Sequence, residues 1–244
     1  MLVLALDTST DAVVVGLIEI ALGADGGSKD SLTVLAAQEC PGARRHSEQL
    51  MPALLEVCAS AARRPAELDA VVCGVGPGPF TGLRVGIASA AAFADALGVP
   101  AHGVCSLDGI AAVHPHAVGR GDGPGASLLV VTDARRREVY WATYLNGQRT
   151  AGPAVDTPAA LADRVPGLGV RVVAGTMAEE LADSFGLVVH PARRPSAAGL
   201  VKAALPALRA GGGPGPLEPM YLRRPDAVPP GARKRVTAGT TGPR

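Results

Sequence analysis

The sequence predicts an α/β fold of two lobes, each with a mixed sheet flanked by helices. Strand-like and helix-like segments alternate along the 244 residues, an order that favours parallel strands joined through helices. Each half also opens in the same way, because residues 2–18 and 128–144 both read as strand, terminal aspartate, polar turn and strand. With 48% hydrophobic residues, the chain can bury a sizeable core.

The first half is predicted to begin with a hairpin and then to alternate strands with helices. Its four predicted strands share an apolar, β-rich composition: residues 2–6, 12–20, 32–38 and 68–75. Apolar side chains recur at helical spacing over residues 47–62, where Pro52 predicts a late start or a kink. A second helix, capped by Thr81, is expected to end at Leu97, just before Gly98.

The second half is predicted to repeat this plan. Its four predicted strands are again apolar and β-rich: residues 127–132, 138–145, 171–174 and 187–190. Helices are expected at residues 176–184 and at residues 197–210, where Pro206 weakens the pattern. Glycine and proline dominate from residue 211, and residues 220–223 look ordered within that stretch. The predicted division is a first lobe with partner-binding helices, a second lobe and a disordered tail: residues 1–104, 105–225 and 226–244.

The composition argues against several classes of protein. A net charge of +1 and only 3% aromatic residues do not suggest a nucleic-acid binder driven by charge or base stacking. The apolar start reaches Asp7 without a basic region before it, so it is interpreted as a buried strand rather than a signal peptide. The run that comes nearest to a membrane span, residues 85–94, is too short. Four widely spaced cysteines indicate reduced thiols in a cytoplasmic protein: Cys40, Cys58, Cys73 and Cys105.

The most specific segment is GVGPGPFTGLR, at residues 74–84. It resembles the GxGPGSFTGLR signature of the TsaB family, with Pro79 where serine is usual. Four other segments are similar to TsaB signatures and follow in the same order: residues 4–10, 45–52, 132–140 and 219–223. The resemblance therefore extends over residues 1–225.

The resemblance implies an actin-like fold, of the actin, Hsp70 and sugar-kinase superfamily, and a role in tRNA modification. TsaB-family proteins, also called YeaZ-like and formerly grouped with M22 glycoproteases, are non-catalytic subunits. They form a heterodimer with TsaD, which transfers a threonylcarbamoyl group to N6 of an adenosine in tRNA to make t6A. The ATPase TsaE joins a larger assembly, a homodimer is possible without TsaD, and tRNA is reached only indirectly through the complex.

The glycine-rich loop has two interpretations. Glycine lets backbone N–H groups approach an anion, so the loop can be a phosphate cradle. However, no lysine lies beside it, and Pro77 and Pro79 each remove a donor. We interpret the loop as a rigid turn that aims the following helix.

That helix carries a stripe of small residues, which indicates close packing. Gly82, Gly86, Ala90 and Ala94 recur every four residues, and a glycine inside a helix costs roughly 1 kcal/mol relative to alanine. The chain's own sheet and a partner subunit both remain possible neighbours. We nominate the helices at residues 47–62 and 81–97 as the partner interface, with Arg84 as a polar contact at its rim. The candidate residues are Leu50, Leu54, Gly82, Arg84, Gly86, Ala90 and Phe93.

Two aspartates, Asp7 and Asp133, end the first strands of the two halves, where actin-like proteins place acidic groups near Mg²⁺. Ser9 stands where phosphate-binding hairpins of that superfamily use glycine, so its Cβ would crowd a phosphate. Arginines at residues 135–137 can pair with phosphate, with a partner or with solvent. The pattern favours weak or vestigial nucleotide binding.

Catalysis is not expected. TsaD-type subunits carry a His-x-x-x-His pair, which can hold a metal from one helix face, but the corresponding residues 103–110 contain no histidine. His114 and His116 flank a proline further on, and neither GxSxG nor HExxH occurs. We therefore expect no catalytic residue, no metal and no cofactor. Two alternatives remain open: an actin-fold kinase that uses ATP on a small molecule, and a peptidase.

Overall fold

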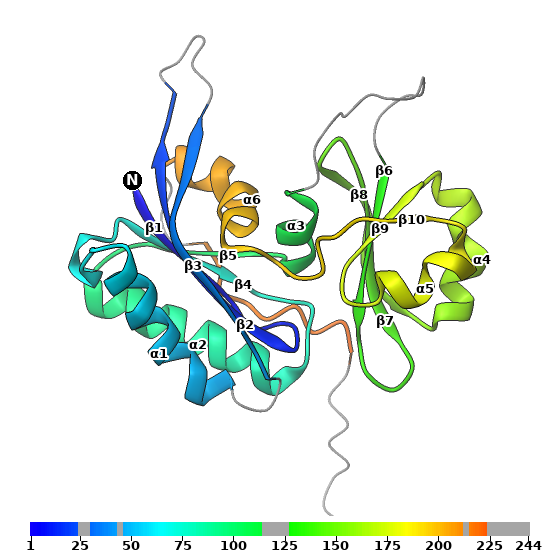
Figure 1. The fold of residues 1–244 in the computed structure, drawn as a ribbon, viewed down its shortest axis with the longest axis horizontal. Coiled ribbons are helices and arrows are strands. Elements are labelled where there is room, and N and C mark those ends of the chain that lie inside the picture. Colours follow the sequence, from blue (N-terminus) through cyan, green and yellow to red (C-terminus); the bar gives the residue numbers. More distant parts are fainter. Residues whose placement is uncertain (24–29, 43–45, 114–126, 212–214, 224–244) are drawn as a thin grey trace, which may run out of the picture.

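The computed structural model describes residues 1–23, 30–42, 46–113, 127–211 and 215–223. These residues form two five-stranded sheets that stand side by side, each with helices on its faces (Figure 1). The predicted tail at residues 226–244 lies outside the described residues.

The first sheet has the strand order β3-β2-β1-β4-β5. Its strands are β1 (Leu2–Asp7), β2 (Ala12–Ala21), β3 (Ser31–Pro41), β4 (Ala70–Gly74) and β5 (Ala101–Val104). Strands β1 to β3 form an antiparallel meander, whereas β4 and β5 run parallel to β1. The predicted opening hairpin is therefore confirmed.

The second sheet has the order β8-β7-β6-β9-β10, which is the first order repeated. Its strands are β6 (Ser127–Asp133), β7 (Val139–Leu145), β8 (Gln148–Asp156), β9 (Val172–Ala174) and β10 (Val188–Val189). Strands β6 to β8 are antiparallel, and β9 and β10 are parallel to β6. The internal repeat predicted from the sequence is thus a repeat of topology.

The helices cover the faces of the two sheets (Figure 1). They are α1 (His46–Ser60), α2 (Phe80–Leu97), α3 (Ser106–Ala111), α4 (Pro158–Leu168), α5 (Ala178–Phe185) and α6 (Ala197–Arg209), with a 3-10 turn at Pro65–Glu67. Side chains alternate along β1, so Leu4 and Leu6 pack under α1 and α2 while Val3 and Ala5 face α6. In the second sheet, α4 and α5 cover one face and α3 covers the other.

The chain returns to the first sheet at its end. Helix α6 follows the second sheet in sequence but packs on the first, where Leu200 and Val201 are fully buried with strand residues. Further on, the Met220 amide donates to the Val75 carbonyl. The segment predicted as the second lobe, residues 105–225, therefore contributes helix α6 and a strap, residues 215–223, to the core of the first sheet.

Most predicted elements agree with the structure, and the exceptions have local causes. The predicted cap at Thr81 is wrong, because α2 begins one residue earlier and its N-cap, Pro79, makes no side-chain hydrogen bond. Pro52 lies inside α1, which runs unbroken from His46. Gly98 ends α2 as predicted, in the left-handed conformation. Strand β8 was missed because Gly152 and Pro153 make its sequence read as a turn.

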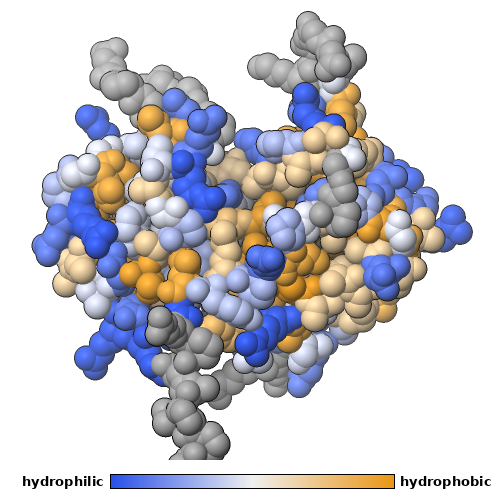
Figure 2. All heavy atoms as spheres, turned by 180° about the vertical axis from the view of Figure 1, so that it is seen from behind, coloured by the Kyte–Doolittle hydropathy of each residue, from blue (hydrophilic) through white to orange (hydrophobic). Residues whose placement is uncertain are grey.

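Helix α2 is the one helix of the described residues that is long and apolar enough to cross a membrane. Its Leu83, Ile87 and Ala90 side chains are instead buried in the core of the first sheet. Seen from behind, the molecule shows apolar patches that are interrupted by hydrophilic side chains (Figure 2). Helix α2 therefore packs one face on the first sheet and leaves residues such as Ala88 and Ala92 exposed.

Candidate functional site

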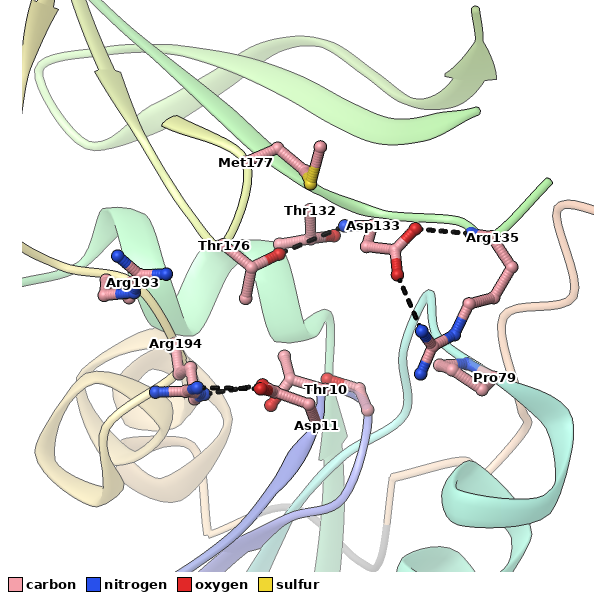
Figure 3. Close-up of a pocket in the computed structure, with 11 residues that line it drawn as sticks. Thr10, Asp11, Pro79, Thr132, Asp133, Arg135, Thr176, Met177, Arg193 and Arg194 are labelled. Atoms are coloured by element: carbon pink, nitrogen blue, oxygen red, sulfur yellow. Dashed lines mark hydrogen bonds and ion pairs between the residues drawn. The ribbon is translucent and has the colours of Figure 1, made fainter. Parts of the chain in front are cut away.

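A cavity of about 210 Å³ lies between the two sheets, at the turns that follow β1 and β6 (Figure 3). It is lined by Ser9, Thr10, Asp11, Pro79, Thr132, Asp133, Arg135, Thr176, Met177, Arg193 and Arg194. Sites for small molecules and cofactors usually measure about 300–1,000 Å³. The cavity is thus smaller than the usual site for a nucleotide-sized ligand.

Asp7, the first of the two predicted acidic groups, is sealed beneath this cavity. Its side chain is 0% exposed and accepts hydrogen bonds from Ser9 N (2.8 Å), Ser9 Oγ (2.7 Å) and Ser106 Oγ (2.5 Å). Burial raises the pKa of Asp7, and the hydrogen bonds from Ser106 and Ser9 oppose that rise. Both carboxyl oxygens are therefore engaged within the chain.

The glycine-rich loop seals Asp7 from the other side. A Cβ at Gly74 would overlap the Asp7 carboxyl, and a Cβ at Gly78 would overlap the Ser9 backbone. The Gly76 amide donates to Ser106 Oγ (3.1 Å), the hydroxyl that also binds Asp7. The loop therefore packs on the β1–β2 turn, as expected of a structural turn rather than an anion cradle.

Asp133, the second predicted acidic group, lies open at the cavity wall. It accepts a hydrogen bond from Arg135 N (2.7 Å) and forms an ion pair with the Arg135 guanidinium at 3.1 Å (Figure 3). Its own amide donates to Thr176 Oγ1 (3.1 Å). The three arginines that follow Asp133 all have positive φ, at 63°, 52° and 62° for Arg135, Arg136 and Arg137.

Arg194 closes the opposite wall, and sequence reasoning missed it. Its guanidinium donates to Asp11 Oδ1 (2.7 Å), Asp11 Oδ2 (2.9 Å) and Glu39 Oε1 (2.7 Å). The hydrogen bonds from Arg194 lower the pKa of Asp11. Because Asp11 and Arg194 are 183 residues apart, no local pattern pointed to this contact.

Comparison with known proteins indicates the family of this chain. A family model described as TsaD: tRNA N6-adenosine threonylcarbamoyltransferase matches residues 41–207. The chain is 49% identical to the uncharacterized protein Rv3421c of Mycobacterium tuberculosis, over 93% of this chain and 94% of that protein. It is 33% identical to the tRNA threonylcarbamoyladenosine biosynthesis protein TsaB of Escherichia coli, over 66% of this chain and 62% of that protein.

Solved structures point to the same family. The structure of YeaZ from Pseudomonas aeruginosa matches with a TM-score of 0.64 and 26% identity, covering 91% of this chain and 99% of that one. A second structure from that organism, described as similar to peptidase YEAZ, has a TM-score of 0.67 and 28% identity over the same shares. The chain belongs to the TsaB-like family. The predicted actin-like fold is confirmed with it.

The small-residue stripe of this TsaB-like chain packs on its own first hairpin. A Cβ at Gly82 would lie 2.7 Å from the Thr8 carbonyl oxygen, and one at Gly86 would overlap Thr8 Oγ1. Ala90 is also buried, in the core of the first sheet. Of the two neighbours left open by the sequence, the stripe therefore contacts the chain's own hairpin.

The other nominated interface residues divide by exposure. Leu50 and Leu54 are buried in the core, so neither side chain reaches the surface. Arg84 is exposed and donates from Nε to the Tyr221 hydroxyl (2.8 Å), while Phe93 is half-buried. Apart from Arg84 and the half-buried Phe93, the surface of the two helices is formed by residues that spacing alone did not single out.

The exposed side of α1 and α2 includes apolar residues, which are small on α2. Met51 and Leu55, one turn apart on α1, are 44% and 54% exposed. Ala88 and Ala92, one turn apart on α2, are exposed as well. We call these four residues the helix face.

The described residues contain no cluster of potential metal ligands and no cysteine whose pKa is lowered. Among them, no three histidine, cysteine or acidic side chains cluster as metal ligands, and His114 and His116 lie outside the described ranges. All four cysteines are free thiols. Burial raises the pKa of the Cys105 thiol to about 12, and it also raises the pKa of Cys73, so neither is an activated thiolate.

Proposed function

We propose that this chain is the non-catalytic subunit of the machinery that makes t6A in tRNA, and that it works by binding the transferase subunit TsaD. The sealed Asp7 carboxyl carries the proposal, because an actin-like enzyme needs that position open to a metal and a phosphate. Membership of the TsaB-like family supports a role in making t6A, since its relatives from Escherichia coli and Bacillus subtilis are named for threonylcarbamoyladenosine biosynthesis.

The helix face is the surface that suits a partner. Helices α1 and α2 lie side by side on the first sheet (Figure 1), so their outer residues form one surface. Burying an exposed leucine or methionine contributes roughly 1.5–3 kcal/mol. The small side chains of Ala88 and Ala92 let a partner helix approach closely. Contact with TsaD, or with a second copy when TsaD is absent, would cover Met51 and Leu55.

The test is capture of purified TsaD by the tagged chain, comparing wild type with Leu55→Asp. A carboxylate buried without a partner is costly, so we expect Leu55→Asp to weaken capture at least tenfold. Val188→Asp is the matched control, because Val188 is 69% exposed on β10 of the other sheet. If Leu55→Asp captures as much TsaD as wild type does, the helix face is not the surface that binds TsaD.

The alternative, an ATP-using kinase of the same fold, is not favoured by the geometry. The cavity between the sheets is about 210 Å³, and Ser9 and Ser106 occupy the oxygens of Asp7. We expect calorimetry with Mg-ATP to give no binding at micromolar nucleotide. Micromolar binding together with turnover would favour the kinase instead. Addition of TsaE to the assembly remains an expectation from the family resemblance.

A further inference from the structure

Three segments carry arginine and aromatic side chains that contact one another, and Pro79, Asp133 and Arg135 of these segments also line the cavity. They are residues 79–84, 133–138 and 219–223, and we call them the arginine surface. They contain five arginines, Arg84, Arg135, Arg136, Arg137 and Arg223, against two carboxylates, Asp133 and Glu138. The arginine surface thus carries a formal charge of 5 − 2 = +3, whereas the whole chain carries +1.

The last of these segments ties the other two together. On one side, the Tyr221 ring lies 4.9 Å from the Phe80 ring, and the Arg84 guanidinium lies 5.5 Å from the Tyr221 ring centre. On the other side, Arg223 donates to the Ala134 carbonyl (3.1 Å) and pairs with Glu138 at 2.7 Å. The orange strap in Figure 1 accordingly passes from the first sheet to the second. The arginine surface is therefore continuous across both lobes.

The middle segment holds its arginines in a costly conformation. Three successive residues, Arg135, Arg136 and Arg137, have positive φ, a region that normally favours glycine or asparagine. All three side chains are exposed, so packing does not explain the choice of arginine. Backbone strain of this kind concentrates at functional sites. The side chains themselves are therefore the feature that the turn presents.

We infer that the arginine surface binds RNA directly, with the turn at Arg135–137 contacting phosphates and Tyr221 stacking on an unpaired base. Guanidinium groups bind phosphate through paired N–H donors, and aromatic and guanidinium planes stack on bases. Tyr221 is 40% exposed, in a chain that has only three tyrosines, three phenylalanines and one tryptophan. The inference rests on the proposed function, which makes tRNA the RNA in question, and it replaces the expectation that tRNA is reached only indirectly.

The charge test uses Arg136→Gly combined with Arg137→Gly. Glycine accepts positive φ freely, so this variant removes two charges while relieving the backbone. The control is Arg63→Ala combined with Arg64→Ala, which removes two exposed charges next to the 3-10 turn, away from the arginine surface. The probe is an unmodified tRNA transcript, titrated with the full chain alone at several salt concentrations.

Counterion release sets the expected size of the effect. Each lost phosphate contact lowers the salt slope by about 0.7, so two contacts lower it by about 1.4 and weaken binding roughly tenfold near 0.15 M salt. The alanine control should bind like wild type. If wild type fails to bind tRNA at 50 mM salt, or if the glycine variant binds as tightly as wild type, the inference is overturned.

A second pair of measurements separates RNA from an acidic protein partner. Tyr221→Leu keeps an apolar contact with Phe80 but removes the stacking plane, and we expect it to weaken binding of a single-stranded RNA oligonucleotide roughly fivefold or more. Poly-glutamate should bind at least tenfold more weakly than RNA at equal charge. Equal affinity for poly-glutamate would assign the surface to an acidic protein and overturn the inference. Capture of TsaD through Leu55 is measured separately, so either proposal can fail without the other.

Discussion

The β1–β2 and β6–β7 turns hold the same place in two sheets of identical topology, but one is sealed and the other is open. Asp7 ends β1 with no exposed surface and three internal hydrogen bonds. Asp133 ends β6 at the cavity wall, paired with Arg135. The two hairpins therefore share a topology, but the turn of the first is buried by packing and the turn of the second presents charged side chains.

The difference between the two turns comes from the segments that cover the β1–β2 turn. Helix α2 approaches the β1–β2 turn so closely that Gly82 and Gly86 contact Thr8, and the glycine-rich loop covers Ser9. Nothing equivalent is found among the described residues around the β6–β7 turn, whose arginines stay exposed. We therefore expect at most weak nucleotide binding between the two turns.

The largest predicted effect comes from opening the contact between α2 and the first turn. A Cβ at Gly86 would overlap Thr8 Oγ1, so Gly86→Ala should destabilise the fold by about 1–3 kcal/mol, despite the helix preference for alanine. Removing the hydroxyl with Thr8→Ala should recover most of that loss in the double variant. Chemical denaturation of the four proteins measures the coupling. If the effects of the two single substitutions simply add in the double variant, the turn accommodates the new methyl group and is not sealed by α2.

A second prediction concerns the pH dependence of stability. Burial raises the pKa of Asp7 in the folded state above its unfolded value. Its contribution to stability is therefore fully present below the unfolded pKa and is lost as pH rises through the folded pKa. Asp7→Asn lacks this titration, so its stability relative to wild type should increase between about pH 4 and pH 7. Urea midpoints across that range test this, and a flat difference would contradict a carboxyl whose pKa is raised by burial.

A smaller effect is expected at the ion pairs that flank the first turn. Arg194 is 17% exposed and binds both Asp11 and Glu39, so Arg194→Gln should cost about 1 kcal/mol. Since Arg194 lowers the pKa of Asp11, the part of that difference due to Asp11 should be lost as pH falls through the folded pKa of Asp11. Arg193→Gln is the control, because its pair with Glu179 is more exposed, and thermal unfolding should barely change.

The smallest effect should come from the open turn, and it should be stabilising. Arg137 has a φ of 62°, so Arg137→Gly is expected to raise the free energy of unfolding by about 0.5 kcal/mol. Arg64→Gly provides the contrast, because Arg64 has a φ of −95° and glycine relieves no strain there. If Arg137→Gly destabilises the protein as much as Arg64→Gly does, the arginine turn is not strained.

The sequence predicted much of this comparison but not its cause. Terminal aspartates and flanking β-rich runs were enough to predict both hairpins and the topological repeat. The spacing of Gly82 and Gly86 predicted a close approach but not its partner, since Thr8 lies more than 70 residues away. For the same reason, Leu50 and Leu54 were nominated for an interface although they are core residues. Periodicity identifies an apolar face without saying which protein covers it.

Contacts between distant charged or aromatic residues were the least predictable part of the site. The Arg194 pair with Asp11 and the Tyr221 contact with Arg84 join residues 183 and 137 positions apart. No local pattern specifies such pairs, because they depend on how α6 and the final strap return to the first lobe. The arginine surface lies where the final strap returns to the first lobe, and the helix face lies on the outer side of α1 and α2.

Reconstituted tRNA modification tests the central claim most directly. Purified TsaD, with TsaE and the threonylcarbamoyl donor, would be mixed with tRNA in the presence of wild-type chain, Leu55→Asp or Val188→Asp, and t6A would be measured by mass spectrometry. We predict full t6A with wild type and Val188→Asp, strongly reduced t6A with Leu55→Asp, and none with the chain in the absence of TsaD. Formation of t6A by the chain without TsaD would contradict the account.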